Sequence, residues 1–411
     1  MKKVLWVVLA ALVLTAAGCG MEETPENTAA PLIEVEVPYE EFSTEAPYLG
    51  VELAFRSIWK REEPQAQALV QAVQFFEKQT GAIVTVFWPE EHTAPENVQP
   101  ADILQISAAD FAAMSPENIL DLTEMAEKAN YDEKSHEMLR RQIVEQCGFL
   151  GAVAQVPYLG GVYYNTDIFE ACALTQTPAT WEDFLNTCKS LRENGWQPLT
   201  LDKEDALAAM ELHLRRSIGT AEIERLMSKN GHWNQDQAAI AALEQVMIFA
   251  QEGNMTYATP ADYPVGQNKM ALSNSAMMIG TNADCAAVEE ATLTDLNWGI
   301  FPYPGSTGSG TYMTADMLAI SPDCKSAQAA FDFIMLLVTG EFDQLRADIA
   351  CGIPADPANA SPISGAREAL EAAQPEPLGL LGSKQLDTAV KLWSAWYKEP
   401  ARFASALERS K

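Results

Sequence analysis

The sequence has few histidines and lacks the short motifs that mark common hydrolases. Its 411 residues include four histidines, and neither G-x-S-x-G nor H-E-x-x-H occurs. These absences argue against an α/β-hydrolase nucleophile and against a zinc protease site. Carboxylate pairs for glycoside hydrolysis stay possible, because Asp and Glu are abundant and their distances in space cannot be read from a sequence. We therefore expect no enzyme, with an exported glycosidase as the weaker alternative.

Positive charge is scarce as well. The chain has 27 Lys and Arg against 57 Asp and Glu, a formal net charge of -30. A polyanion of this kind repels nucleic acid and anionic lipid, so we expect no DNA, RNA or peripheral-membrane partner. No residue pattern indicates a cofactor.

The seven cysteines show no C-x-x-C spacing, which makes a zinc site improbable and leaves no metal ligands to propose. After Cys19, six remain: Cys147, Cys172, Cys188, Cys285, Cys324 and Cys351. An even number in an exported chain permits disulfides. A chain with a large core does not require them, so we favour free thiols. If a bridge forms, Cys172 to Cys188 closes a short loop and is our first choice.

Only one long apolar run occurs, and it lies at the start of the chain. Lys2 and Lys3 precede an apolar segment from Val4 to Leu14, which is too short for a stable membrane span and is typical of an export signal. Ala16, Ala17 and Gly18 then lead to Cys19, a pattern that resembles the lipobox of bacterial lipoproteins. We predict a signal peptide over residues 1–18 and acylation of Cys19. Two acyl chains would anchor the chain stably. The alternative is an ordinary secretory signal with a chance cysteine.

The segment that follows is acidic and poor in core-forming groups. Between Gly20 and Pro47 it carries eight glutamates and neither Lys nor Arg. Such a segment buries too little apolar surface to offset the entropy of ordering it. We predict a disordered tether over residues 19–47.

From residue 48 the pattern is that of a folded α/β protein. Val51–Phe55 and Ile83–Trp88 read as strands on either side of a helix that begins at Pro64 and stops at Gly81. Strand, helix and strand in this order predict a parallel sheet. Further strands are expected over 102–107, 151–157 and 298–301, and further helices over 109–114, 180–195, 207–228, 237–252, 326–339, 367–373 and 384–397.

Short blocks follow one another along the chain in an order known from one family. They are F-F-E-K-Q-T-G-A-I-V-T-V, A-D-I-L-Q-I-S, L-D-L-T-E, V-P-Y-L-G-G-V-Y-Y-N-T-D-I-F, Q-T-P-A-T-W-E-D-F, S-A-M-M-I-G-T-N, W-G-I-F-P-Y-P-G, L-A-I-S-P and C-G-I-P-A. Together they resemble the blocks of extracellular solute-binding proteins of ATP-driven importers, the family that includes maltose-binding protein.

The resemblance implies an α/β fold of two discontinuous lobes, the type II periplasmic-binding-protein fold. We place one lobe at 48–158 with 299–345 and the other at 159–298 with 346–411. Hinge crossings are expected near Pro157 to Tyr163, near Trp298 to Pro304 and after Gly340. The implied function is a monomeric lipoprotein on the extracytoplasmic face of the cell membrane. It would hold a small solute between its lobes and deliver it to the permease of an ABC transporter.

Ligand-binding residues are expected where strands of an open α/β sheet end. Trp59, Tyr158 and Trp233 could stack on sugar rings, although each could instead be a core aromatic, Trp233 more so than the other two. Asn282 stands where relatives often carry a cleft tryptophan, so one stacking surface is missing. The remaining candidates are polar groups after the first and third strands and after the glycine-rich loop: Arg56, Ser57, Ser107, Asp110, Thr311 and Tyr312. That loop lacks the Lys of a phosphate-binding P-loop.

We expect the solute to be a mono- or oligosaccharide. A polyamine is the alternative, because Asp102, Asp110 and Asp316 could surround a cation, and similar folds also carry metal chelates and phosphodiesters. An adhesin that binds another protein would favour repeats, and no repeat is visible in the sequence.

Overall fold

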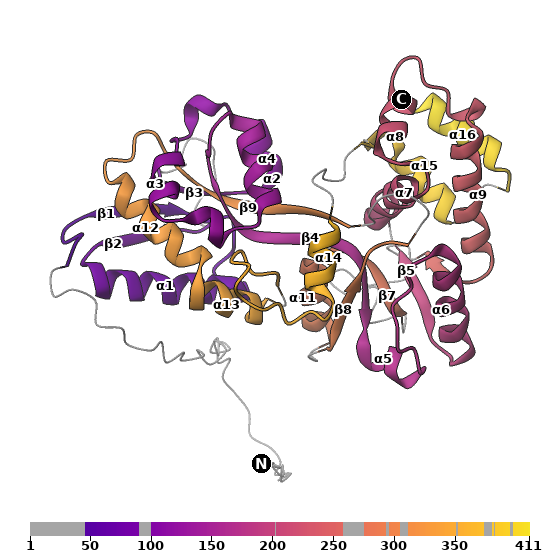
Figure 1. Cartoon of the computed structure of the whole chain (residues 1–411), viewed down its shortest axis with the longest axis horizontal. Helices are drawn as coiled ribbons and strands as arrows, with labels where there is room; N and C mark the ends of the chain where they lie inside the picture. Colours follow the sequence, from indigo (N-terminus) through magenta and orange to yellow (C-terminus); the bar gives the residue numbers. More distant parts are fainter. Residues whose placement is uncertain are drawn as a thin grey trace, which may run out of the picture. The chain divides into compact units, whose positions relative to one another are not determined.

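The computed structural model describes residues 46–89, 100–201, 203–257, 275–292, 296–304, 311–350, 352–373, 380–381, 383–394 and 398–411 (Figure 1). The predicted signal peptide, Cys19, most of the tether, Cys351 and the glycine-rich loop at 305–310 lie outside these ranges. The predictions about them therefore stay predictions.

Within the described ranges, nine strands form the sheet, in the order β2-β1-β3-β9-β4-β7-β5-β6, with β8 beside β4. Their bounds are β1 Glu52–Arg56, β2 Ile83–Phe87, β3 Ile103–Ile106, β4 Val153–Asn165, β5 Gln197–Leu201, β6 Met255–Tyr257, β7 Ser275–Gly280, β8 Trp298–Phe301 and β9 Tyr312–Ile320. We call β2, β1, β3, β9 and the start of β4 the first half-sheet, and the end of β4 with β8, β7, β5 and β6 the second half-sheet. Strand β1 pairs in parallel with both β2 and β3, as the sequence predicts.

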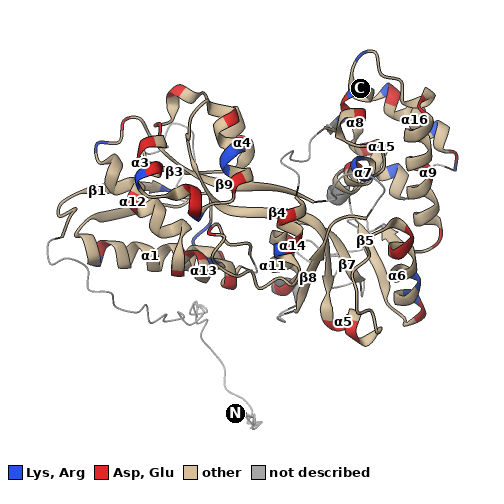
Figure 2. Ribbon diagram, in the orientation of Figure 1, with Lys and Arg blue, Asp and Glu red and all other residues tan. Residues whose placement is uncertain are grey.

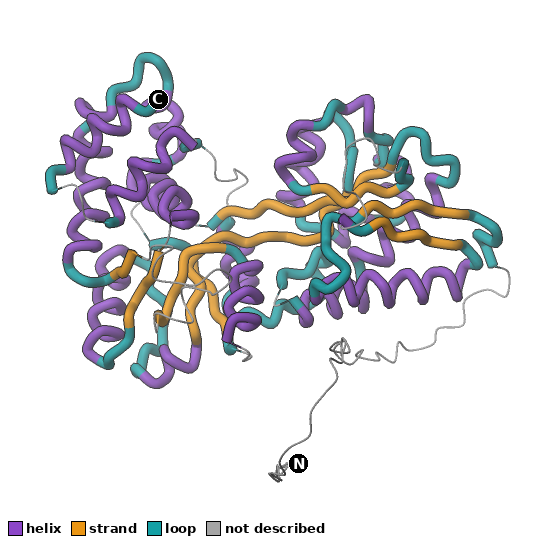
Figure 3. The backbone as a smooth tube through the Cα atoms, turned by 180° about the vertical axis from the view of Figure 1, so that it is seen from behind, coloured by secondary structure: helices purple, strands orange, loops and turns teal. Residues whose placement is uncertain are grey.

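The long strand β4 belongs to both half-sheets. Its residues from Val153 to Gly160 pair antiparallel with β9, and the residues from Gly161 onward pair with β7 and β8. Figure 3 shows β4 and β9 running side by side as long orange strands. The register shifts between Ala154 and Val156, a β-bulge that leaves Gln155 unpaired in the ladder. The predicted strand at 151–157 is thus the first part of a longer strand.

Helix α1 (Pro64–Thr80) shows how local sequence sets the element bounds. Pro64 occupies the first turn, where its missing N–H is not needed, and Gly81 ends the helix in the left-handed conformation at φ 74°. The buried face consists of apolar residues at helical spacing, Ala66, Ala68, Leu69, Ala72 and Phe76. Phe76 packs on Phe333 of α12 (Ala327–Val338), with ring centroids 5.0 Å apart. Helix α1 therefore covers the first half-sheet together with α12.

In the second half-sheet region, helix α6 (Trp181–Glu193) begins with a complete capping box between Thr180 and Asp183. Its first residue, Trp181, packs on Phe184, His213, Phe249 and Tyr303, so this tryptophan is structural. The helical stretch predicted over 207–228 consists of parts of two helices. Gly219, at φ 87°, separates α7 (Lys203–Ile218) from α8 (Thr220–Met227).

The other helices are α2 Ala108–Ala113, α3 Thr123–Lys128, α4 Glu137–Cys147, α5 Thr166–Ala171, α9 Gln237–Gln251, α11 Asn282–Thr292, α13 Gly340–Ile349, α14 Ala366–Ala372, α15 Leu386–Trp393 and α16 Pro400–Arg409, with short 3₁₀ turns η3 Pro116–Asn118, η4 Tyr131–Lys134, η5 Trp233–Gln235 and η6 Ser383–Gln385. One hydrophobic core joins the second half-sheet to α6, α7, α9, α15 and α16. Helix α13 packs on α1, and the ring centroids of Phe342 and Phe75 lie 5.4 Å apart. The predicted lobe boundary at 345 falls inside this helix.

None of the described cysteines forms a disulfide bond. Cys172, Cys188 and Cys285 are buried, and Cys147 and Cys324 are partly buried. Our first-choice bridge between Cys172 and Cys188 is therefore wrong: both side chains belong to the apolar core around α6 as separate thiols. Burial raises the pKa of the Cys188 thiol and keeps it protonated.

Charged side chains are distributed over the helices. Figure 2 shows Asp and Glu on helices of both half-sheet regions, interspersed with fewer Lys and Arg. Among the described residues, no helix combines the length and the apolar character needed to cross a bilayer.

Candidate functional site

A small pocket lies beside β4 near the point where this strand passes from one half-sheet to the other. Its volume is about 100 Å³, below the roughly 300–1,000 Å³ of typical ligand pockets. It draws residues from the loop after β1, from α1, from β4, from α11 and from α13: Trp59, Gln65, Val156, Tyr158, Asn282, Ala283, Ala286, Arg346, Ala350 and Gly352. Three residues predicted from the sequence, Trp59, Tyr158 and Asn282, thus line one pocket.

The position of Trp59 is fixed by a buried hydrogen-bond network. The Trp59 backbone N–H donates to Ser57 Oγ at 3.0 Å, and Ser57 Oγ donates to Gln105 Oε1 at 2.8 Å. Gln105 Nε2 in turn donates to Gln155 Oε1 at 2.7 Å, so the bulged residue of β4 completes the chain. Ser57, predicted as a ligand residue, is buried, does not line the pocket and accepts from the backbone of Trp59 instead.

Tyr158, which lines the pocket, is hydrogen-bonded to Asp316 behind it in the sheet. The Tyr158 hydroxyl donates to Asp316 Oδ2 at 2.6 Å, and Asp316 lies on β9 opposite Val156. Burial raises the pKa of Asp316 to about 6, although the Tyr158 hydrogen bond and the Arg346 charge act in the other direction. Burial, together with the nearby Asp316 carboxylate, also raises the pKa of Tyr158. Tyr158 therefore stays a neutral hydrogen-bonding phenol at physiological pH.

The side chain of Asn282, just after the end of β7, forms hydrogen bonds with the backbone of β4 as a paired strand would. Gly280 at the end of β7 faces Gly161, and the same antiparallel register places Asn282 opposite Leu159. The Asn282 side chain accepts from the Leu159 N–H at 2.9 Å and donates to the Pro157 carbonyl at 3.2 Å. It therefore satisfies the backbone of β4 at a point where it also borders the pocket.

Arg346 was not predicted from the sequence, and it is the charged group of the pocket. Its side chain is 3% exposed. Nη2 donates to Asp343 Oδ1 and to the Ile353 carbonyl, each at 2.8 Å. Nε and Nη1 are buried and find no hydrogen-bond partner among the described residues. A buried guanidinium with unpaired donors is energetically costly and marks a site that a ligand could complete.

Other predicted residues have local roles. Ser107 caps α2, where its Oγ accepts from the Asp110 N–H at 3.1 Å and donates to Asp110 Oδ2 at 2.7 Å. Thr311 is buried and donates to the Ala369 carbonyl at 3.3 Å. The Tyr312 ring lies across Gly160 of β4. Arg56 ends β1, opposite Phe87 and Leu104.

Trp233 lies in the core and is unavailable to a ligand. It is fully buried in the cluster that joins α9 and α16, and its backbone N–H donates to Glu408 at 2.9 Å. We therefore withdraw Trp233 as a stacking residue: nothing in its sequence neighbourhood distinguishes a core tryptophan from a cleft tryptophan.

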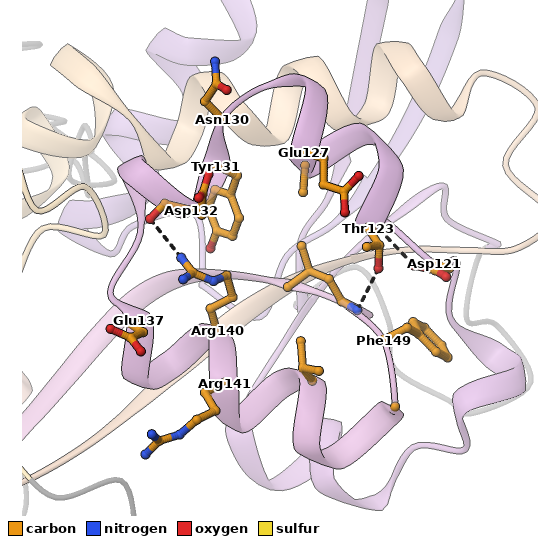
Figure 4. Close-up of a pocket in the computed structure, with 14 residues that line it drawn as sticks. Asp121, Thr123, Glu127, Asn130, Tyr131, Asp132, Glu137, Arg140, Arg141 and Phe149 are labelled. Carbon is orange, nitrogen blue, oxygen red and sulfur yellow. Dashed lines mark hydrogen bonds between the residues drawn. The ribbon is translucent and has the colours of Figure 1, made fainter.

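A second cavity, of about 940 Å³, lies between α3, η4 and α4 (Figure 4). None of the residues predicted to bind ligand lines it. Its arginines already have partners: Arg140 Nη1 donates to the Asp132 carbonyl and to Ser135 Oγ at 2.9 Å, and Arg141 lies 3.6 Å from Glu145. We prefer the smaller pocket as the candidate site because it combines aromatic rings with unpaired donors.

The comparison with known families agrees with the resemblance seen in the sequence. The family described as "Bacterial extracellular solute-binding protein" matches residues 71–364, more than half of the chain. The chain therefore belongs to the bacterial extracellular solute-binding proteins. This is a family of binding proteins, which confirms the prediction of a non-enzymatic role. No curated protein matches the chain.

Solved structures support the fold. RafE from Streptococcus pneumoniae in its apo form is 17% identical, with a TM-score of 0.66 over 90% of this chain and 98% of that chain. RafE in complex with raffinose is 17% identical, with a TM-score of 0.63 over 87% and 98%. Lmo0181 from Listeria monocytogenes in complex with cycloalternan is 16% identical, with a TM-score of 0.60 over 88% and 97%. The mixed α/β fold of periplasmic-binding proteins is thus confirmed.

Proposed function

We propose that the protein captures a carbohydrate at the pocket beside β4 and delivers it to the permease of an ABC importer. The observation that carries the proposal is the meeting of Trp59 and Tyr158 with Asn282 and Arg346 around one pocket. Aromatic faces pack on the apolar faces of sugar rings, and planar amide and guanidinium groups match hydroxyl and ring oxygens. Structural neighbours in complex with raffinose and cycloalternan support the same class of solute.

The pocket volume limits what part of the solute it receives. A space of about 100 Å³ accepts the end of one sugar unit and not a whole oligosaccharide. The remaining units of a longer ligand would extend beyond the pocket. A polyamine fits less well, because the described residues that line the pocket include no carboxylate to pair with its ammonium groups. The carboxylates considered for polyamine binding also have other roles: Asp102 accepts from the Ala54 N–H at 2.8 Å, and Asp110 accepts from the Ser107 hydroxyl at 2.7 Å.

The proposal includes an anchor at Cys19 and a location on the outer face of the cell membrane. Membership of an extracellular family supports export, and the lipobox-like pattern supports acylation. Expression of the full chain in a bacterium, followed by detergent phase partitioning, tests this part. The wild-type chain should enter the detergent phase, and Cys19→Ser should move it to the aqueous phase. Partitioning of both chains into the aqueous phase would contradict lipid anchoring.

Ligand class is tested by thermal-shift screening of the folded chain against mono- and oligosaccharides, amino acids and polyamines, followed by calorimetry on the hits. Tyr158→Phe removes the hydroxyl at the pocket, and Tyr164→Phe makes the same change on the same strand outside it. We expect Trp59→Ala to weaken sugar binding by more than about tenfold, Tyr158→Phe by several-fold, and Tyr164→Phe to have no effect. Hits confined to polyamines would contradict the proposal.

A further inference from the structure

The hydroxyl of Tyr158 connects the ligand pocket to a buried carboxyl group. Tyr158 on β4 lines the pocket, and its Oη lies 2.6 Å from Asp316 Oδ2 on β9. Asp316 is opposite Val156 in the antiparallel register, so Tyr158 is its diagonal neighbour on the same face of the sheet. Asp316 is 8% exposed and is not among the residues that line the pocket. A solute in the pocket therefore meets Tyr158, and Asp316 acts on the solute through Tyr158.

The direction of this hydrogen bond depends on the charge of Asp316. An ionised carboxylate has no proton and only accepts, so the Tyr158 hydroxyl must donate its single proton to Asp316. The hydroxyl oxygen then has only lone pairs left for the pocket, where it acts as an acceptor. A protonated carboxyl group has an O–H of its own that can donate to Tyr158, and the tyrosine proton is then free to bond a ligand.

The surroundings of Asp316 place this change of charge in an accessible pH range. Among the described residues, Tyr158 gives the Asp316 carboxyl group its only hydrogen bond. Three charged groups face the pair from neighbouring elements: Arg346 on α13 favours the ionised form of Asp316, Asp110 on α2 disfavours it, and Glu63, just before α1, acts on Tyr158. Burial is the largest effect and raises the pKa of Asp316 to about 6. The carboxyl group is therefore mostly ionised at pH 7.5 and mostly protonated at pH 4.5.

We propose that Asp316 is a positioning residue that commits Tyr158 to accept hydrogen bonds from the solute while the carboxyl group is ionised. The site then selects a sugar hydroxyl that donates to Tyr158 Oη, and protonation or replacement of Asp316 removes the selection. The inference rests on the proposed function, and it adds which kind of ligand group Tyr158 prefers. A sugar hydroxyl can donate, whereas an ether oxygen or a fluorine at the same place cannot.

Raman spectroscopy of the ligand-free protein tests the direction of the hydrogen bond. The tyrosine Fermi doublet distinguishes a hydroxyl that donates from one that accepts. The difference spectrum between wild type and Tyr158→Phe isolates this ring from the other tyrosines of the chain. We expect a donor signature at pH 7.5 and a mixed signature at pH 4.5. In Asp316→Asn, compared with its own Tyr158→Phe double variant, the signature should be the same at both pH values, because an amide never ionises and both donates and accepts.

Calorimetry tests the selection of the ligand group. The probes are methyl glucoside and methyl galactoside, together with derivatives of each in which one hydroxyl at a time is replaced by fluorine. Fluorine is close to a hydroxyl in size and cannot donate. At the hydroxyl that meets Tyr158, we expect the replacement to weaken binding to the wild type by about tenfold at pH 7.5. The loss should shrink to less than about threefold in the wild type at pH 4.5 and in Asp316→Asn at both pH values.

A second tyrosine–aspartate pair in the chain provides the matched control. The Tyr48 hydroxyl donates to Asp332 on α12, and neither residue lines the pocket. Asp332→Asn makes the same chemical change as Asp316→Asn away from the site. This variant should keep the tenfold loss at pH 7.5 and the wild-type dependence on pH.

The outcomes separate the inference from the proposed function. A fluorine penalty at one position that depends on Asp316 and on pH, with a Raman signature that changes in parallel, supports the inference. Fluorine penalties that are the same in wild type and Asp316→Asn at every position, or a Raman signature of Tyr158 that does not change with pH, overturn the inference and leave the sugar function standing. Binding of polyamines alone, or of no sugar in the panel, overturns the proposed function itself.

Discussion

At the scale of single residues, Asp316 shows most clearly how burial in the fold changes the pKa of a side chain. The carboxyl group is 8% exposed and lies among β-strands, so loss of water disfavours its charged form. The hydrogen bond from Tyr158 offsets only part of this effect, and the pKa rises to about 6. Asp316 therefore changes charge within the range in which many bacteria live.

This shift predicts a pH dependence of stability. The pKa of Asp316 is higher in the folded chain than the ordinary value of 3.8, so the folded state binds more protons between pH 4 and pH 6. The contribution of Asp316 is fully present below the unfolded pKa and is lost as pH rises through about 6. At about 1.4 kcal/mol per pKa unit, the loss is on the order of 2 to 3 kcal/mol.

Urea denaturation of wild type and Asp316→Asn at pH 4.5 and pH 7.5 measures this effect. The asparagine keeps an acceptor for Tyr158 and never ionises. The wild type should lose stability relative to the variant as pH rises. A difference between the two proteins that is the same at both pH values would contradict the raised pKa.

Residue roles at the site were only partly visible in the sequence. Trp59 and Tyr158 follow or lie on strands of the first half-sheet, and the rule that ligands bind at strand ends brought them to the pocket. Trp233 has the same kind of aromatic side chain, suited to stacking on a sugar, but it lies in the core. Arg346 was not predicted, because an Asp and an Arg three residues apart on a helix usually form an exposed ion pair. Only the fold shows that this pair is buried.

At the scale of elements, the pairing of β4 with β9 depends on one close approach. The Tyr312 ring lies over Gly160, and a Cβ on residue 160 would lie 1.9 Å from Tyr312 Cε1. We predict that Gly160→Ala lowers the free energy of unfolding by about 2 kcal/mol or more, because the ring or the strand must move. The double variant Gly160→Ala with Tyr312→Ala removes the clash and should be more stable than the sum of the two single changes implies. Additive effects in denaturation would argue against this contact.

Helix α6 offers a smaller, local test. Thr180 accepts from the Asp183 N–H at 3.1 Å and completes the capping box. Thr180→Ala should lower the free energy of unfolding by about 1 kcal/mol. Thr220→Ala is the matched control, because α8 is preceded by Gly219 and has no side-chain cap. Equal losses in the two variants would mean that the cap contributes nothing specific.

Elements with clear end signals were predictable, and elements without them were not. Pro64 with Gly81, and Thr180 with Gly195, bracket helices that the structure confirms within a residue or two. The prediction over 207–228 did not take account of Gly219, whose positive φ separates α7 from α8. Strands β7 and β9 were missed because apolar runs such as Ser275–Gly280 carry no alternation when both faces are buried.

At the scale of the whole molecule, the fold does not depend on disulfide bonds among its described cysteines. None of these five forms a disulfide, and a core of this size stabilises the chain without cross-links. We predict that the soluble Cys19→Ser chain has the same melting temperature with and without a reductant, within about 2 °C. A thiol assay in denaturant without reductant should detect at least these five groups. A clear fall in melting temperature on reduction would contradict this view.

The shared strand β4 also constrains how the chain could be divided. Its thirteen residues complete the first half-sheet with one end and the second half-sheet with the other. Segments that follow β4 in the sequence contribute to both regions. Strand β9 pairs within the first half-sheet, and α15 and α16 pack against the second half-sheet. Neither region could then be cloned as an autonomous fragment by simple truncation. A split reporter built on this scaffold would have to be cut in a surface loop, with both pieces co-expressed so that they reassemble around β4.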